Sequence, residues 1–181
     1  IAHPEVKILN CSLNTSHRYI RTYYARMYEA KFLMGAIAGA MAENGQLAYI
    51  ADYPIFGTIA NINAFALGAK MVNPRAQVYL EWSTLKDVDL GIAMDNVIKK
   101  GVTVVSGQDM VIPEDASRYF GLYHIEKEGP RNLAMPLWHW GKFYEQLIRT
   151  IMDGTWKYDD NKDETKAINY WWGLSAEVID V

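Results

Sequence analysis

The chain has 181 residues, of which 50% are hydrophobic and 22% are charged, with a formal net charge of −3 and a pI near 5.8. This composition is ordinary for a globular protein and argues against a largely disordered chain. The acidic balance argues against the broad basic surface that binds nucleic acid.

Residues that catalysis or metal binding would require do not occur in the necessary patterns. The single cysteine, Cys11, cannot form an internal disulfide, and we expect it to be a small buried residue of a strand. The four histidines lack metal-ligand spacing, and no nucleophile elbow or phosphate-binding loop is present. No apolar run approaches the ~18 residues of a membrane span. We therefore expect no enzyme activity, no metal and no cofactor.

Strands and helices alternate along the predicted chain. This alternation predicts βαβ crossovers and a three-layer αβα fold of the α/β class, in which helices cover both faces of a mainly parallel sheet. The predicted strands are 6–11, 46–52, 76–82, 102–106, 121–125, 133–138 and 176–181, and the predicted helices are about 22–43, 56–71, 88–100, 113–119 and 141–153.

The stretch 28–74 has the clearest pattern, because it predicts a helix, a buried strand, a tight turn and a second helix without interruption. Asn44-Gly45 ends the first helix, and 47–51 is a short apolar run typical of a buried parallel strand. Gly35 and Gly39 form a GxxxG pattern inside the first helix, where glycine permits close packing.

Polar and aromatic side chains follow the predicted strands. In open α/β sheets ligands bind outside the carboxyl ends of the strands, so these side chains predict a ligand site. An aromatic ring stacks on a flat base, and a carboxylate accepts hydrogen bonds from a sugar diol or a ring N–H. The residues concerned are Asp52, Tyr53, Phe56, Trp82, Ser83, Thr84, Ser106, Gln108, Asp109, His124, Trp138, His139 and Trp140.

Several of these residues have alternative structural roles. Asp52 or Asp109 could instead cap the following helix, and Phe56 could cover the sheet. Trp138 and Trp140 are predicted to share one strand face, which fits either a pocket wall or core packing. The pair Trp171-Trp172 is better explained by packing against a neighbouring layer.

Five segments of the chain resemble the basic membrane protein (Bmp) family, which comprises substrate-binding proteins of ABC importers, including purine nucleoside receptors, and some related regulators. The resemblance covers nearly the whole chain, and its most specific blocks are YEAKFLMGAIAG, INAFALGAKMVNP and DGTW. The five segments are HPEVKILNCS, RMYEAKFLMGAIAGAMAENGQLAYIADYPIFGTIANINAFALGAKMVNPRAQVYLEWS, GVTVVSGQD, PLWHWGKFYEQLIRTIMDGTW and YWWGLSAEVIDV.

The resemblance implies the fold of a type I periplasmic binding protein, in which two α/β lobes are joined by three crossings. Residues 1–181 would then be the carboxyl-terminal portion, the second lobe plus part of the first, without the amino-terminal lobe. Residues 44–140 would form the second lobe, 1–43 and 141–160 would cross back to the first lobe, and 161–181 would form a tail strand.

The resemblance also implies recognition of a purine nucleoside or a similar small polar ligand by lobe closure, without catalysis. The implied partners are an ABC permease and the amino-terminal lobe, on the cell surface or in the periplasm, with membrane attachment only through a lipid anchor outside this chain. An alternative is an effector-sensing domain of a cytoplasmic transcriptional or signalling regulator.

In the segment LYHIEKEGPRN, His124 replaces the polar group expected for the family. The expected ligand-binding residues are Asp52, Phe56, Gln108, Asp109, His124, Trp138 and Trp140.

Overall fold

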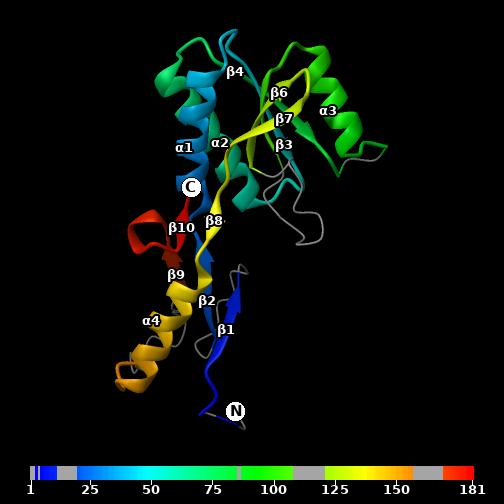
Figure 1. Ribbon diagram of the computed structural model, residues 1–181. Helices are drawn as coiled ribbons and strands as arrows, with labels where there is room; N and C mark the ends of the chain where they lie inside the picture. Colours follow the sequence, from blue (N-terminus) through cyan, green and yellow to red (C-terminus); the bar gives the residue numbers. More distant parts are fainter. Residues whose placement is uncertain (1–2, 4, 12–19, 85–86, 108–120, 157–168) are drawn as a thin grey trace. The chain divides into compact units, whose positions relative to one another are not determined.

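The computed structural model describes residues 3, 5–11, 20–84, 87–107, 121–156 and 169–181 (Figure 1), and the chain divides into two compact units. Unit 1 comprises residues 1–26 and 138–180. Unit 2 comprises residues 27–137 together with Val181.

Unit 1 contains a three-stranded parallel sheet in the order β1-β2-β9. Tyr23, in the middle strand, pairs with Cys11 on one side and with Tyr170 on the other. A short 3-10 helix (Leu174–Ala176) precedes β10, which pairs with β8 in a two-stranded sheet. The elements are β1 (Ile8–Cys11), β2 (Ile20–Ala25), β8 (Leu137–Trp138), α4 (Trp140–Met152), β9 (Asn169–Trp172) and β10 (Ile179–Asp180).

Aromatic side chains from α4, β2 and β9 form the core of unit 1. Phe143 of α4 is only 1% exposed, and its ring stacks on Tyr23 with the centroids 4.7 Å apart. Trp172 meets the same Phe143 ring edge-on at 5.1 Å. We call this set the aromatic cluster; its members are Tyr23, Trp140, Phe143, Tyr144, Tyr170 and Trp172.

Unit 2 contains a five-stranded sheet in the order β4-β3-β5-β6-β7. Strands β4, β3 and β5 are parallel, whereas β6 and β7 run antiparallel to their neighbours. The predicted α/β class with helices on both faces of a sheet is confirmed. The elements are α1 (Met27–Met41), β3 (Gln46–Ala51), α2 (Phe56–Val72), β4 (Gln77–Trp82), α3 (Leu90–Lys99), β5 (Val104–Ser106), β6 (Leu122–Glu126) and β7 (Gly129–Ala134).

Helices α1 and α2 cover one face of this sheet and α3 covers the other (Figure 1). The alternation of side chains along β3 produces the two cores. Leu47 and Tyr49 pack with Met34 and Phe65 under the first two helices. Ala48 and Ile50 point to the opposite face, with Ala93 and Val97 of α3.

Glycine allows α1 and α2 to pack with their backbones almost in contact. A Cβ atom on Gly39 would lie 2.6 Å from the carbonyl oxygen of Ala69, and one on Gly35 would collide with the backbone of Phe65. Gly68 of α2 faces the Phe32 carbonyl in the same way. The close helix packing predicted from the GxxxG pattern is therefore confirmed.

Several predicted elements differ from the structure. The helix predicted from residue 22 begins at Met27, because Ile20–Ala25 form a strand between β1 and β9. The segment 169–172 is an unpredicted strand, and the tail strand is confined to 179–180. Cys11 is exposed, not buried. The predicted helix at 113–119 lies outside the described residues.

Unit 2 includes α1 and begins at Met27, because α1 packs on α2 and on the sheet of that unit. Within the described residues, no helix combines the length and apolar character needed to cross a membrane.

Candidate functional site

The carboxyl ends of β4, β3 and β5 lie next to one another, because these strands are parallel neighbours. The last residue of β3, Ala51, pairs with Trp82 at the end of β4. Ser106, the last residue of β5, pairs with Tyr49. We call this border the carboxyl edge of unit 2, and it is where ligands bind in open α/β sheets.

Asp52 is fixed to the end of β4 by two hydroxyl groups. The Ser83 hydroxyl donates to Asp52 Oδ1 at 3.1 Å, and the Thr84 hydroxyl donates to the Asp52 carbonyl oxygen. The N-cap residue of α2 is Ile55, whose side chain makes no capping hydrogen bond. Asp52 is therefore not the N-cap residue of α2, and it directly follows β3 at the carboxyl edge, as predicted.

Exposed aromatic and apolar side chains stand where α2 begins. Phe56, the first residue of the helix, is 78% exposed, and Tyr53 and Ile55 are exposed as well. Phe56 therefore does not cover the sheet, the alternative suggested by the sequence. Its ring is instead accessible for stacking on a flat ligand.

A buried lysine lies beneath the same edge. Lys31 of α1 has no exposed surface, and its Nζ donates to the Ser106 hydroxyl at 3.2 Å. The same Nζ lies 5.0 Å from the centre of the Tyr49 ring. Lys31 was not among the residues predicted for the site. Its helical spacing from the buried Met34 and Ala38 was the available signal.

His124 does not reach the carboxyl edge. Strand β6 is antiparallel to β5, so Leu122 pairs with Ser106 while His124 pairs with Val104, farther from the edge. The His124 Nδ1 lies 3.5 Å from Glu126 Oε1, which also accepts from Arg131 Nε at 2.8 Å. The structure therefore places His124 in a charged group away from the other predicted site residues.

Trp138 and Trp140 both belong to unit 1. Strand β8 ends at Trp138 and α4 begins at Trp140, so the prediction that the two share a strand face is wrong. The Trp140 ring meets Tyr23 edge-on at 5.4 Å, which supports core packing. Gln108 and Asp109 lie outside the described residues.

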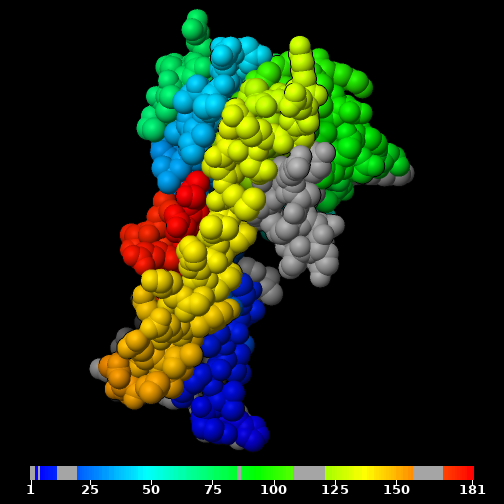
Figure 2. Space-filling model, viewed as in Figure 1, coloured from blue at the N-terminus to red at the C-terminus, as the bar shows by residue number. Residues whose placement is uncertain are grey.

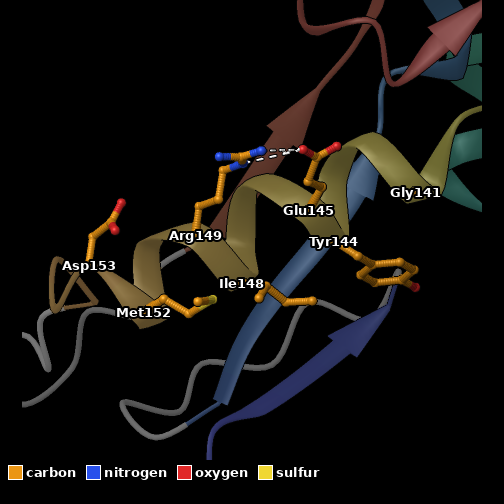
Figure 3. Close-up of a pocket in the computed structure, with 7 residues that line it drawn as sticks. All are labelled: Gly141, Tyr144, Glu145, Ile148, Arg149, Met152 and Asp153. Atoms are coloured by element: carbon orange, nitrogen blue, oxygen red, sulfur yellow. Dashed lines mark hydrogen bonds and ion pairs between the residues drawn. The ribbon is translucent and has the colours of Figure 1, made fainter.

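A shallow, open pocket lies on α4 at the surface of unit 1. The atoms of this helix are the yellow to orange ones in Figure 2. Figure 3 shows Tyr144, Ile148 and Met152 on one side of the helix and the Arg149–Glu145 ion pair on the other, with 2.7 Å between Nη2 and Oε1. Its lining residues belong to this one helix and to Asp153, the residue that caps its carboxyl end, so polar groups from several elements do not converge there as they do at the carboxyl edge. The lining residues are Gly141, Tyr144, Glu145, Ile148, Arg149, Met152 and Asp153.

Metal-binding geometry is not found in the described part of the chain. No three His, Cys, Asp or Glu side chains in that part come together as a possible ion site. The carboxyl edge instead offers a carboxylate, hydroxyl groups and an exposed ring, which suit a small polar ligand with a flat ring.

Comparison with known proteins identifies a family. The model of the Bmp family, described as ABC transporter substrate-binding proteins that are PnrA-like, matches residues 12–114. A purine-binding protein of Brucella abortus is 26% identical over 97% of the chain, and a putative ABC transporter glucose-binding protein of Haloferax volcanii is 29% identical over 76%. The chain spans 51% and 38% of the lengths of these two relatives, respectively.

Solved structures share the fold at low sequence identity. A solute-binding protein of an ABC transporter system from Conexibacter woesei superposes with a TM-score of 0.59 at 14% identity, covering 98% of this chain and 61% of that one. A transcriptional activator of the comK gene from Bacillus halodurans gives a TM-score of 0.60 at 12% identity, covering 99% and 63%. At these identities the similarity establishes the fold alone.

Proposed function

The chain belongs to the Bmp family of PnrA-like ABC transporter substrate-binding proteins, and on this basis we propose that it forms part of a receptor for a purine nucleoside. The receptor binds its ligand by closure of two lobes and performs no catalysis. The ligand is delivered to an ABC permease, and the receptor works outside the cytoplasm, held to the membrane by a lipid anchor.

One observation carries the proposal: Asp52 and Phe56 stand together at the carboxyl edge of unit 2. The Ser83 hydroxyl holds the Asp52 carboxylate at 3.1 Å, so this acceptor has a fixed position. A carboxylate of this kind accepts two hydrogen bonds from the hydroxyls of a ribose. Phe56, 78% exposed at the start of α2, offers its ring for stacking on a purine.

The named relatives support a ligand that combines a base and a sugar. One is a purine-binding protein and the other a putative glucose-binding protein. A nucleoside contains both chemical groups, so its base can stack on the aromatic ring at the edge and its sugar can bind to the carboxylate. We also assign ligand contacts to Gln108 and Asp109, which follow β5 along the chain.

Fluorescence titration of the full-length protein tests the ligand class. The chain has six tryptophans, so closure around a ligand should change the intrinsic emission. We expect a saturable change with adenosine, guanosine or inosine, and a weaker one with free purines. A response to glucose alone would replace the nucleoside by a sugar, and no response to any of these compounds would refute the proposal.

The role of Asp52 is tested by Asp52→Asn, which keeps the shape of the side chain and removes its charge. We expect nucleoside affinity to fall roughly tenfold, because hydrogen bonds to charged groups are the stronger ones. Asp95→Asn, at an exposed position of α3, is the matched control and should retain wild-type affinity. Equal affinities for the two variants would remove Asp52 from the ligand site.

A further inference from the structure

Lys31 is a charged side chain among the buried apolar residues of α1. It lies on α1 and is fully buried, as are the apolar residues Ala30, Met34 and Ala38 on the same helix. Removing an ammonium group from water is expensive, and replacing buried charges by apolar residues of similar volume is often neutral or stabilising. Packing alone therefore does not account for a lysine at this position.

The contacts of Lys31 place its ammonium group directly under the carboxyl edge. Nζ lies 3.2 Å from the hydroxyl of Ser106, the last residue of β5, and 5.0 Å from the centre of the Tyr49 ring. Tyr49 and Ser106 are paired across neighbouring strands, so the ammonium spans the boundary between β3 and β5. Asp52, at the end of β3, belongs to the same edge.

A positive charge in this position acts on any ligand bound at the edge. Lys31 and Ser106 are both fully buried, so water screens the charge less than it would at the surface. The contribution of Lys31 to this field favours ligand groups that carry negative charge or carbonyl oxygens, and it acts alongside the opposite contribution of the Asp52 carboxylate at the same edge.

We propose that Lys31 determines the charge preference of the ligand site and selects purine nucleosides with an anionic or oxygen-substituted ring. This inference rests on the proposed nucleoside function and deepens it. Ser106 is the positioning residue, because its hydroxyl accepts from the Lys31 ammonium and holds it beneath the edge.

Two ligands of similar size distinguish the charge effect from a change in shape. Xanthosine is largely anionic at neutral pH, whereas guanosine is neutral there, and the two bases differ in the substituent at C2, which is an oxygen in xanthosine and an amino group in guanosine. We expect wild-type protein to bind xanthosine more tightly than guanosine. In Lys31→Met the ratio of the two affinities should fall on the order of tenfold, as expected for the loss of one poorly screened charge.

Three variants complete the experiment. Lys70→Met makes the same change at an exposed lysine of α2 and should leave the ratio at the wild-type value. Lys31→Arg keeps the charge and should preserve the preference for xanthosine. Lys31→Gln provides the neutral comparison if the methionine variant does not fold.

The outcomes separate this inference from the proposed function. If wild-type protein binds neither nucleoside, the proposed function fails and the inference fails with it. If wild-type protein binds guanosine at least as tightly as xanthosine, or if both neutral variants keep the wild-type ratio, only the role of Lys31 is refuted.

Discussion

The cores of the two units of the chain differ in their packing chemistry. Unit 1 is held together by large rings, with Phe143 in contact with aromatic residues of both β2 and β9. Unit 2 depends on small residues, since Gly35, Gly39 and Gly68 allow α1 and α2 to approach until their backbones nearly touch.

This difference determines where each unit tolerates change. A ring-filled core loses most when a ring is removed, because a cavity remains. A core built on close backbone contact loses most when an atom is added, because backbone cannot move aside as a flexible side chain can. The carboxyl edge lies in unit 2, next to the helices that have the least space for added atoms.

The largest effect should come from removal of the central ring of unit 1. Phe143→Ala is expected to lower the free energy of unfolding by about 3–5 kcal/mol, because the buried side chain leaves a cavity. Urea unfolding measures the loss, and amide hydrogen exchange locates it. Ile148→Ala on the exposed side of the same helix is the control. If amide protection falls in unit 2 as much as in unit 1, the proposed difference between the two cores is contradicted.

A single added methyl group should disturb unit 2. Gly35→Ala is expected to cost roughly 2–3 kcal/mol, because its Cβ collides with the Phe65 backbone. The same change at Gly141 meets no atom within 4 Å and should be neutral or stabilising, since alanine favours a helix. Equal unfolding midpoints for the two variants would contradict the close packing of α1 and α2.

The aromatic cluster should also give unit 1 a specific sensitivity to alkaline pH. Burial, followed by the hydrogen bond with Tyr144, raises the pKa of Tyr23 above its ordinary value of 10.0. The folded state therefore keeps a proton that the unfolded state loses, so this contribution is complete below pH 10.0 and is lost as the pH rises above it.

Tyr23→Phe tests this sensitivity. It should cost about 0.5–1.5 kcal/mol at neutral pH through the lost hydrogen bond, and it should reduce the alkaline decline. Urea unfolding of wild type and variant at neutral and alkaline pH measures both effects. An unchanged alkaline slope would show that Tyr23 titrates alike in both states.

The smallest effect is expected on the surface of α4. Arg149 lowers the pKa of the Glu145 carboxyl through a hydrogen bond, but both side chains are exposed. Solvent screens such pairs, so Glu145→Gln should leave the unfolding midpoint nearly unchanged at moderate salt. A loss of stability comparable to that of Gly35→Ala would show that the exposed face of α4 stabilises unit 1 more than expected.

Local patterns predicted the parts of the fold that depend on nearby residues. The apolar run of β3, the turn at Asn44-Gly45 and the close packing at Gly35 and Gly39 all follow from short stretches of sequence. The same patterns placed Asp52 and Phe56 at the carboxyl edge, because the end of a buried strand and the start of a helix are both visible in the sequence.

The features that were missed depend on partners far away in the chain. Strand β2 pairs with β1 and with β9, and no local pattern shows that Tyr23 lies opposite Tyr170. The direction of β6, which takes His124 away from the edge, is set by pairing and not by its own residues. The burial of Lys31 likewise follows from how α1 packs on the sheet.

Amide hydrogen exchange with and without a saturating purine nucleoside tests the central claim most directly, because it shows both whether the ligand binds and where. We predict slower exchange at the carboxyl edge of unit 2, in residues 52–57, 83–84 and 106–107, and unchanged exchange in the β6–β7 turn near Gly129. Protection at the β6–β7 turn with none at the edge would contradict the assignment of the ligand site to the carboxyl edge.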